Sequence, residues 1–307
     1  MKKCTVIYNP NSGKKINGNF INQFEDILSK YDYDTTIIYT EHKGHARELM
    51  LEIDEPDLVI SVGGDGTFNE VVTGNFEREK RLLIAHIPVG TTNDIGAMFG
   101  YGKSVIANLK MLLNGEIKGI DICLINNHPF VYVAGFGKFM NIPYETPRDL
   151  KKRIGYFAYL FEGAKSFRNK TNLYDLTYTC NGETYKGLYS FMLISNANRI
   201  AGINNFYKEV KLDDNQFEVL FCNLTTKSDI IKSLYYLKTS DITKVPGFYF
   251  HKTNQLDIIF KEPPKKSWCV DGEALPDNTT NFQIRIFRNM KIMLPSKNIN
   301  KLFEKKE

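Results

Sequence analysis

The stretch VISVGGDGTFNE, residues 59–70, decides how the rest of the chain is interpreted. It begins as a short apolar run and continues into three glycines around Asp65, and a helix can follow with Thr67 as N-cap and Glu70 three residues later. This order predicts a buried strand, a tight loop and a helix N-terminus. Glycines let backbone N–H groups approach a ligand, and a helix N-terminus favours anions such as phosphate. The negative Asp65 fits such a site if a metal ion lies between carboxylate and phosphate, whereas a purely structural turn is the alternative.

The composition is typical of a globular protein without a membrane span. The 307 residues predict two domains, and 42% hydrophobic and 24% charged residues are ordinary values. No apolar run approaches the roughly 20 residues that cross a bilayer, and the N-terminus is typical of a first strand and not of a signal peptide. We therefore expect a cytoplasmic protein, with peripheral association on the inner face of the membrane left open.

The net charge limits the classes of binding partner, and the cysteine spacing limits the kinds of metal site and disulfide that we expect. The net charge of +5 fits a nucleotide, phosphate or an anionic membrane surface, and we expect no nucleic acid partner. The five cysteines are scattered without a Cys-x-x-Cys pair, so buried free thiols are expected and a zinc site or disulfide framework is not.

Residues 1–122 alternate apolar strands with helical patterns, which predicts an α/β domain with a mostly parallel sheet covered on both faces. We expect strands at 4–8, 33–39, 57–62 and 82–87, and helices at 19–30, 44–53, 67–76, 93–99 and 104–114. Ligands of such sheets bind beyond the carboxyl ends of the strands.

Residues 123–295 have the pattern of a mainly antiparallel β-rich domain, with hairpin dipeptides such as Asn181-Gly182. Helices are expected at about 150–167 and 226–236, and strands at 132–137, 173–180, 185–195, 217–224, 248–252, 255–260, 266–270, 282–287 and 291–294. The last segment, 296–307, is expected to pack back on the first domain with a short helix at 298–303.

The four expected parallel strands each end in a loop rich in small and polar residues. The second strand is followed by Thr40, and the other three loops are Asn9-Pro10-Asn11-Ser12-Gly13, Gly63-Gly64-Asp65-Gly66-Thr67 and Pro88-Val89-Gly90-Thr91-Thr92-Asn93-Asp94. Because the carboxyl ends of parallel strands lie on one edge, these loops together predict a phosphate-binding rim, although each alone is a common turn. The common nucleotide fingerprints are absent, since Gly102-Lys103-Ser104 lacks the first glycine of a Walker A loop and no strand precedes Gly-x-Gly-x-x-Gly.

These loops, combined with Asp271-Gly272-Glu273 late in the second half, closely resemble the diacylglycerol kinase catalytic-domain family. The resemblance covers nearly the whole chain. It implies an NAD kinase/diacylglycerol kinase-like fold, with an α/β nucleotide domain, a β-rich domain and the active site in the cleft between them. It also implies transfer of the γ-phosphate of ATP, with Mg²⁺, to a lipid hydroxyl at the membrane surface.

The resemblance assigns roles to individual residues. The nucleotide would be held by Asn9, Pro10, Asn11, Ser12, Gly13, Thr40, Gly63, Gly64, Asp65, Gly66, Thr67, Thr91 and Asn93. Asp65 would act through Mg²⁺, and Asp271 and Glu273 would serve as the base, with the choice between them open. If both lie in a strand, alternation points their side chains to the same side, whereas Asp-Gly is also a common hairpin dipeptide.

Soluble bacterial members of the family carry a further Mg²⁺ site, which maps to the Asp214 carboxylate and the carbonyls of Lys211 and Gln216. The family usually has Asp-Gly where this chain has Asp214-Asn215, so a plain turn is equally compatible; Asn also tolerates left-handed backbone.

The acceptor and the assembly state stay open. Diacylglycerol is the expected lipid, with phosphatidylglycerol, undecaprenol and sphingoid bases as alternatives, and edge strands leave room for a homodimer. An NAD kinase-like metabolite kinase is a rival, but its Asn-Glu motif between the halves is missing because Asn69-Glu70 comes too early. A catalytically silent nucleotide sensor is a second rival, which the complete motif set disfavours.

Overall fold

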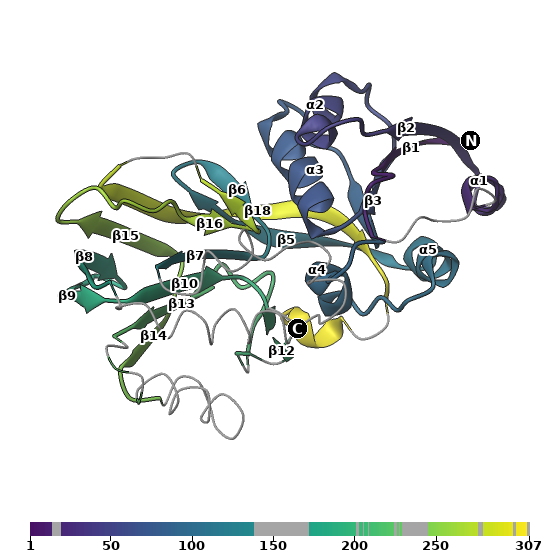
Figure 1. Ribbon diagram of the computed structural model, residues 1–307. Helices are drawn as coiled ribbons and strands as arrows, with labels where there is room; N and C mark the ends of the chain where they lie inside the picture. Colours follow the sequence, from purple (N-terminus) through teal and green to yellow (C-terminus); the bar gives the residue numbers. More distant parts are fainter. Residues whose placement is uncertain are drawn as a thin grey trace. The chain divides into compact units, whose positions relative to one another are not determined.

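Figure 1 shows the computed structural model, which describes residues 1–13, 20–137, 172–200, 203–204, 206–207, 209–223, 226, 228, 245–275, 279–296 and 299–305. The chain divides into two compact units, and the division falls inside strands β5 and β18. The first unit contains Met1–Ile122, Lys211–Asp214 and Arg288–Glu307, and the second contains Cys123–Val210 and Asn215–Phe287. Residues 211–214 and 288–295, expected in the second domain, are therefore part of the first unit.

The first unit is built on a parallel sheet in the order β2-β1-β3-β4, to which the end of β18 adds a fifth parallel strand. Its elements are β1 (Lys2–Tyr8), α1 (Phe20–Lys30), β2 (Tyr33–Tyr39), α2 (His45–Glu52), β3 (Leu58–Gly63), α3 (Asp65–Glu77), β4 (Ile84–Pro88), α4 (Asp94–Met98), α5 (Val105–Leu113), the start of β5 (Glu116–Ile125), the end of β18 (Asn281–Leu294) and the 3-10 turn η2 (Asn300–Leu302). Strand β3 is buried along its whole length, as expected for a sheet covered on both faces.

Helices cover the two faces of this sheet. Tyr8 and His86 lie on opposite faces, because Val62 pairs with Tyr8 and with the residue after His86. Phe20 of α1 packs on Tyr8 at 6.1 Å between ring centroids, and Phe68 of α3 stacks on His86 at 4.7 Å. Helices α1 and α3 thus cover opposite faces, and α2 packs beside α3 (Figure 1).

Helix α3 begins two residues earlier than expected. Gly64 is its N-cap residue and the helix already includes Asp65, so Thr67 is an internal residue rather than the cap. The hydroxyl of Thr67 instead accepts a hydrogen bond from the side chain of Asn9. The N-cap residue Gly64 has no side chain, so no side chain caps this end of the helix. The side chains of Asp65 and Thr67 form hydrogen bonds with neighbouring loops instead.

The second unit consists of antiparallel sheets around one aromatic core. One sheet has the order β14-β13-β10-β7-β16-β17, and in another the first part of β18 pairs with β15, followed by β8 and β9. The elements are the end of β5, β6 (His128–Phe130), β7 (Val133–Gly137), β8 (Tyr174–Cys180), β9 (Glu183–Tyr189), β10 (Phe191–Ser195), β11 (Arg199–Ile200), β12 (Ile203–Asn204), β13 (Phe217–Cys222), β14 (Phe248–Thr253), β15 (Gln255–Phe260), β16 (Cys269–Val270), β17 (Glu273–Ala274) and the start of β18.

Buried aromatic rings join the two sheets. Tyr178 of β8 stacks on Phe221 of β13 with ring centroids 3.9 Å apart. Trp268, just before β16, contacts Phe136 of β7 at 5.3 Å and Phe282 of β18 at 5.5 Å. This core fixes the β16–β17 hairpin that carries Asp271.

Two expected strand assignments are wrong in detail. The stretch 185–195 forms two strands, because β9 pairs with β8 whereas β10 pairs with β7 and β13, and the chain changes sheet at Ser190. The stretches 282–287 and 291–294 belong to the single strand β18. Asn289 has a left-handed φ of 65° within that strand, next to Gly119, where a side chain has no room.

The expected helices at 150–167 and 226–236 lie outside the described residues, apart from the isolated Thr226 and Ser228. All five cysteines are buried, and none of them forms a disulfide. Among the described residues, no helix is both long and apolar enough to cross a membrane.

Candidate active site

Three of the expected loops are joined at the carboxyl edge of the parallel sheet. The side-chain amide of Asn9, after β1, donates to Thr67 Oγ1 at 2.9 Å, and the backbone N–H of Gly64, after β3, donates to Ser12 Oγ at 3.2 Å. The backbone N–H of Val89, after β4, donates to the carbonyl of Gly63 at 2.8 Å. The rim that the sequence predicts therefore forms around the N-terminus of α3.

Glycines make this close approach feasible. A Cβ on Gly13, whose φ is +65°, would lie 1.9 Å from the carbonyl oxygen of Val89, and one on Gly90 would lie 2.7 Å from Gly64 Cα. Gly66 differs, because a Cβ there meets no atom within 4 Å. The first turn of α3 thus has open space beside Gly66, while its leading N–H groups have no partners within the helix. This is the arrangement in which a helix N-terminus can bind a phosphate group.

Asp65 connects this rim to the loop after β4. Its carboxylate accepts hydrogen bonds from the backbone N–H groups of Asp94 at 3.0 Å and Ile95 at 3.1 Å. Asn93 has a left-handed φ of 52° and donates from its side chain to the Gly90 carbonyl at 2.9 Å. Each carboxylate oxygen has a second lone pair, so Asp65 can hold the α4 N-terminus and still bind a cation.

The other expected nucleotide contacts lie around this edge. Thr40 is buried directly after β2, and its N–H donates to the carbonyl of Tyr8 at 2.9 Å. Pro10 and Thr91 are exposed, as is Asn11, whose N–H donates to Asn9 Oδ1 at 2.9 Å.

Asp271 occupies the turn of the β16–β17 hairpin in the second unit. Asp271 and Gly272 both have positive φ values, 46° and 90°, so Asp271 is a turn residue and only Glu273 belongs to a strand. Strand alternation therefore does not align the two carboxylates, because Asp271 lies outside the strand. The Asp-Gly pair forms the hairpin turn that its composition favours.

The carboxylate of Asp271 is buried and hydrogen-bonded to the backbone. It accepts three backbone hydrogen bonds, from Val131 at 2.8 Å, Tyr132 at 3.1 Å and Val133 at 2.8 Å. Burial raises the pKa of Asp271 to about 6; the three N–H donors oppose this rise and the nearby Glu273 adds to it. An aspartate with such a pKa is a stronger base than an ordinary one and is still ionised at neutral pH.

The residues of the expected second metal site belong to a turn that is divided between the two units after Asp214. Lys211 and Asp214 belong to the first unit and Gln216 to the second. Lys211 Nζ donates to the carbonyls of Lys301 at 2.8 Å and Phe303 at 3.1 Å. Asn215 has a φ of 60°, which is the left-handed conformation that the family's glycine would adopt here.

One contact near the rim had no signal in the sequence. Glu70, which spacing indicates as a capping-box residue, instead accepts hydrogen bonds from the N–H groups of Gly44 at 2.9 Å and Ala46 at 3.2 Å. It therefore ties the start of α2 to α3. Nothing in the local spacing indicates a contact between residues so far apart in the chain.

Known proteins are similar to this chain in sequence over most of its length. The diacylglycerol kinase catalytic domain model matches residues 3–125. A diacylglycerol kinase of Staphylococcus epidermidis is 30% identical over 93% of this chain and 91% of that protein, and one of Staphylococcus aureus is 29% identical over 97% and 94%.

Solved structures share the fold. A diacylglycerol kinase structure from Bacillus anthracis superposes with a TM-score of 0.77 at 22% identity and covers 95% of this chain and 97% of that one. A second structure from the same organism gives a TM-score of 0.80, also at 22% identity, and covers 95% of both chains. The chain belongs to the diacylglycerol kinase family of lipid kinases and is a phosphotransferase whose acceptor is an alcohol group.

Proposed function

We propose that this protein transfers the γ-phosphate of ATP, in the presence of Mg²⁺, to the hydroxyl of diacylglycerol and so forms phosphatidic acid. The observation that carries the nucleotide part is the rim around α3, where open space at Gly66 lies beside helix N–H groups and the Asp65 carboxylate. The relatives named as diacylglycerol kinases support the choice of acceptor.

The rim residues have different roles in binding the nucleotide. Backbone N–H groups of the first turn of α3 contact phosphate oxygens, and Ser12 and Asn9 keep the first loop against that turn. The donor set fits Mg²⁺, because Asp65 offers carboxylate oxygens and the cation prefers oxygen ligands. Bound there, Mg²⁺ would neutralise phosphate charge during transfer. A second Mg²⁺ on Asp214 and the carbonyls of Lys211 and Gln216 would have a structural role.

In the reaction, the lipid hydroxyl oxygen forms a bond to the γ-phosphorus while the bond to the bridging oxygen of ADP breaks. The hydroxyl proton passes to the carboxylate pair Asp271 and Glu273. Asp271 suits this role because its pKa of about 6 brings its basicity towards neutral pH. Since diacylglycerol resides in membranes, we further propose that the protein works at a membrane surface.

The test is a kinase assay on the purified chain with γ-labelled ATP, Mg²⁺ and mixed micelles, each micelle preparation containing one lipid. We expect label in phosphatidic acid and a loss of at least about 100-fold in kcat for Asp65→Asn, the size of effect typical of removing a key electrostatic group. Asp54→Asn, at an exposed position on the same unit, is the matched control.

Three results would change the proposal. Label in phosphatidylglycerol, undecaprenol or a sphingoid base, but not in diacylglycerol, would replace the acceptor. Absence of label in every lipid would overturn the lipid kinase assignment, and phosphate incorporation into NAD would support the metabolite kinase instead. A wild-type rate in Asp65→Asn would remove Asp65 from the reaction.

A further inference from the structure

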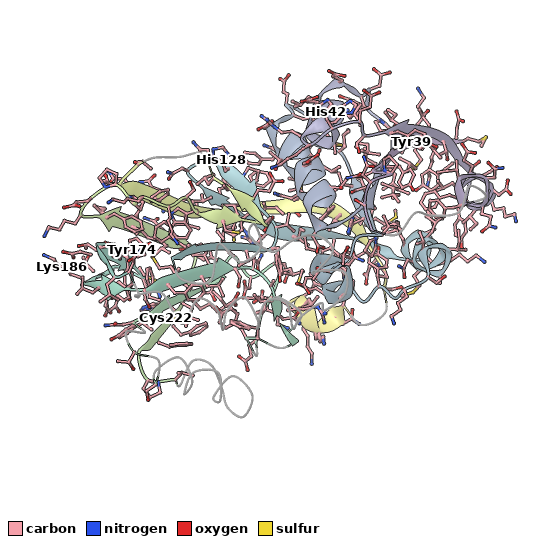
Figure 2. All side chains as sticks on the ribbon, viewed as in Figure 1. Tyr39, His42, His128, Tyr174, Lys186 and Cys222 are labelled. Atoms are coloured by element: carbon pink, nitrogen blue, oxygen red, sulfur yellow. The ribbon has the colours of Figure 1, made fainter. Side chains whose placement is uncertain are left out.

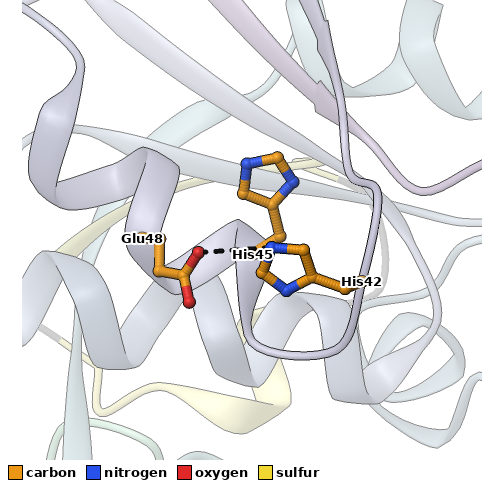
Figure 3. Close-up of side chains that lie close together, drawn as sticks. All are labelled: His42, His45 and Glu48. Carbon is orange, nitrogen blue, oxygen red and sulfur yellow. Dashed lines mark ion pairs between the residues drawn. The ribbon is translucent and has the colours of Figure 1, made fainter.

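Two histidines and a glutamate meet at the start of α2, outside the residues used above. His42 lies in the loop before the helix, whereas His45 and Glu48 are one turn apart on α2 and so share a face. Their nearest ligand atoms all lie within 4.8 Å of one another, and Figure 3 shows the three side chains together. His42 Nε2 is 3.5 Å from Glu48 Oε2, and the rings of His42 and His45 stack with centroids 4.6 Å apart.

We propose that His42, His45 and Glu48 form a binding site for a divalent transition-metal ion of the Zn²⁺ type. Two imidazoles and one carboxylate, with water in the fourth position, are a usual ligand set for zinc. Ligand atoms of a tetrahedral zinc ion are about 3.3 Å apart, given bond lengths of about 2.0 Å. The His42–Glu48 distance is already close to this value, so the site can form by side-chain rotation.

The local hydrogen bonds prepare His42 for this role. Its Nδ1 lies 3.0 Å from the carbonyl oxygen of Lys43, which can only accept a hydrogen bond, so Nδ1 carries the proton. The lone pair is then on Nε2, the atom that faces Glu48. A histidine that donates one ring N–H to a carbonyl while the other nitrogen is available is the common arrangement in metal sites.

His45 undergoes a defined change on binding. The backbone N–H of Glu41 donates to His45 Nδ1 at 2.9 Å, which leaves the proton of the neutral ring on Nε2. If Nδ1 binds the ion, that hydrogen bond is lost. If Nε2 binds it, Nδ1 must carry the proton and can no longer accept. Either way the Glu41 amide loses its partner, and since Glu41 is exposed, water can replace it.

The surroundings favour a divalent transition-metal cation over an anion or Mg²⁺. Glu48 is directed at His42, which disfavours an anion between them. Imidazole nitrogens suit Zn²⁺, Cu²⁺ or Ni²⁺, whereas Mg²⁺ prefers oxygen ligands. The loop is also anchored, because Glu70 of α3 holds the N–H groups of Gly44 and Ala46 and thereby fixes the backbone on either side of His45.

The test titrates Zn²⁺ into the full chain against a chromogenic chelator, in the presence of excess Mg²⁺. We expect one equivalent to bind, and His42→Gln and Glu48→Gln to weaken binding by more than about 100-fold, the upper end of what loss of an outer-shell partner causes. His128→Gln, at an exposed histidine of β6, is the matched control and should bind as the wild type does; His42 and His128 are both labelled in Figure 2.

Amide NMR provides a readout that does not depend on activity. Zn²⁺ should shift the Glu41 amide signal in the wild type and not in Glu48→Gln. Because the side chains of His42 and Glu48 are 55% and 54% exposed, the variants should keep the wild-type melting temperature. The proposal is overturned if the wild type binds no Zn²⁺ at micromolar concentration, if both variants bind it as tightly as the wild type, or if the Glu41 signal does not move.

Discussion

Asp271 and Glu273 belong to one hairpin, but their carboxyl groups are in different surroundings. Asp271 is buried and accepts three backbone N–H groups, whereas Glu273 is half-buried on β17. If Asp271 accepts the lipid proton, kcat/KM is half-maximal near pH 6, levels off about one pH unit higher, and falls about tenfold per pH unit well below pH 6 as the carboxylate protonates. We predict this acid limb for the wild type, and predict that Glu273→Gln retains it.

Rates measured from pH 4.5 to 8 on the wild type and Glu273→Gln decide between the two carboxylates. A limb that disappears in Glu273→Gln would make Glu273 the base. Asp271→Asn should lower kcat by at least about 100-fold, as loss of a general base does. Its melting temperature should also fall, because an amide NH₂ would face one or more of the three N–H donors.

The lowered pKa of the buried His86 should make the stability of the first unit depend on pH. It is fully buried on β4, and burial lowers its pKa to about 3, which the Ser61 backbone only partly opposes. The unfolded chain binds a proton at this histidine near pH 6.5, whereas the folded chain does not until about pH 3. Stability from this group is therefore complete above pH 6.5 and falls by up to about 1.4 kcal/mol per pH unit below it.

Urea unfolding at pH 7, 6 and 5 tests this expectation. His86→Leu removes the titrating group with little change in volume, so the variant should lose less stability between pH 7 and pH 5 than the wild type. His128→Gln, which changes an exposed histidine, should follow the wild type. Parallel curves for the wild type and His86→Leu would contradict the prediction.

At this scale, motifs indicated which residues gather at the rim but not how they are held. Spacing suggested Thr67 as a cap and Glu70 as its capping-box partner, whereas Thr67 binds Asn9 and Glu70 binds the start of α2. The bonds from Asp65 to the N–H groups of Asp94 and Ile95 join residues 29 and 30 positions apart. Local pattern carries no information about such contacts, because they depend on how the loops meet in three dimensions.

At the scale of elements, α2 and α3 approach each other closely at a glycine, Gly74. A Cβ on Gly74 of α3 would lie 2.6 Å from Met50 Cβ and 2.7 Å from the carbonyl oxygen of Arg47, both on α2. Gly74→Ala should therefore destabilise the chain by about 1–3 kcal/mol, the usual cost of overpacking, even though alanine is the better helix former. Thermal or urea unfolding measures the effect.

Gly102→Ala is the matched control, because the nearest atom to its added Cβ is 3.9 Å away and its φ is not left-handed. It should unfold within about 0.5 kcal/mol of the wild type, as surface substitutions usually do. Equal stability of Gly74→Ala and the wild type would show that the two helices can separate at no cost.

Elements of the first unit were easier to predict than those of the second. Strand β2 runs from Tyr33 to Tyr39 as expected, because a short run of aromatic and β-branched residues bounded by polar turns identifies a strand even at the edge of a sheet. In the second unit, an apolar stretch that changes sheet at Ser190 looks like one strand, and β18 looks like two because the polar pair Arg288 and Asn289 interrupts its pattern. Both strand boundaries depend on which strands pair with each other, and the pattern of apolar residues along the chain does not specify the pairing.

At the scale of the whole molecule, the first unit is not one continuous segment. Leu212 joins it through the Asp121 N–H, which donates to the Leu212 carbonyl at 2.6 Å, and through its own N–H, which donates to Leu302 at 2.7 Å. The sequence suggested that only the last residues return to the first domain. A return in mid-chain leaves no composition change or linker that could have indicated it.

The C-terminal segment 288–307 should therefore be required for the first unit to fold. It adds the end of β18, where Ile292 pairs with Ile84 of β4. Among its described residues it also buries, besides Pro295, six large apolar side chains, at Met290, Ile292, Leu294, Ile299, Leu302 and Phe303. Burying each such side chain contributes about 1.5–3 kcal/mol, so their combined contribution is comparable to the roughly 5–15 kcal/mol by which a domain is stable.

A chain that ends at Phe287 should consequently lose the cooperative unfolding transition of the first unit and become sensitive to protease within residues 1–122. A chain that ends at Glu304 is the control, because it keeps all six side chains and the hydrogen bond from the Glu304 N–H to Asp213 at 2.8 Å. Circular dichroism melts and limited proteolysis compare the two with the full chain. An unchanged transition in the chain ending at Phe287 would mean that residues 1–122 form a complete core alone, and that the return of the C-terminus adds only surface contacts.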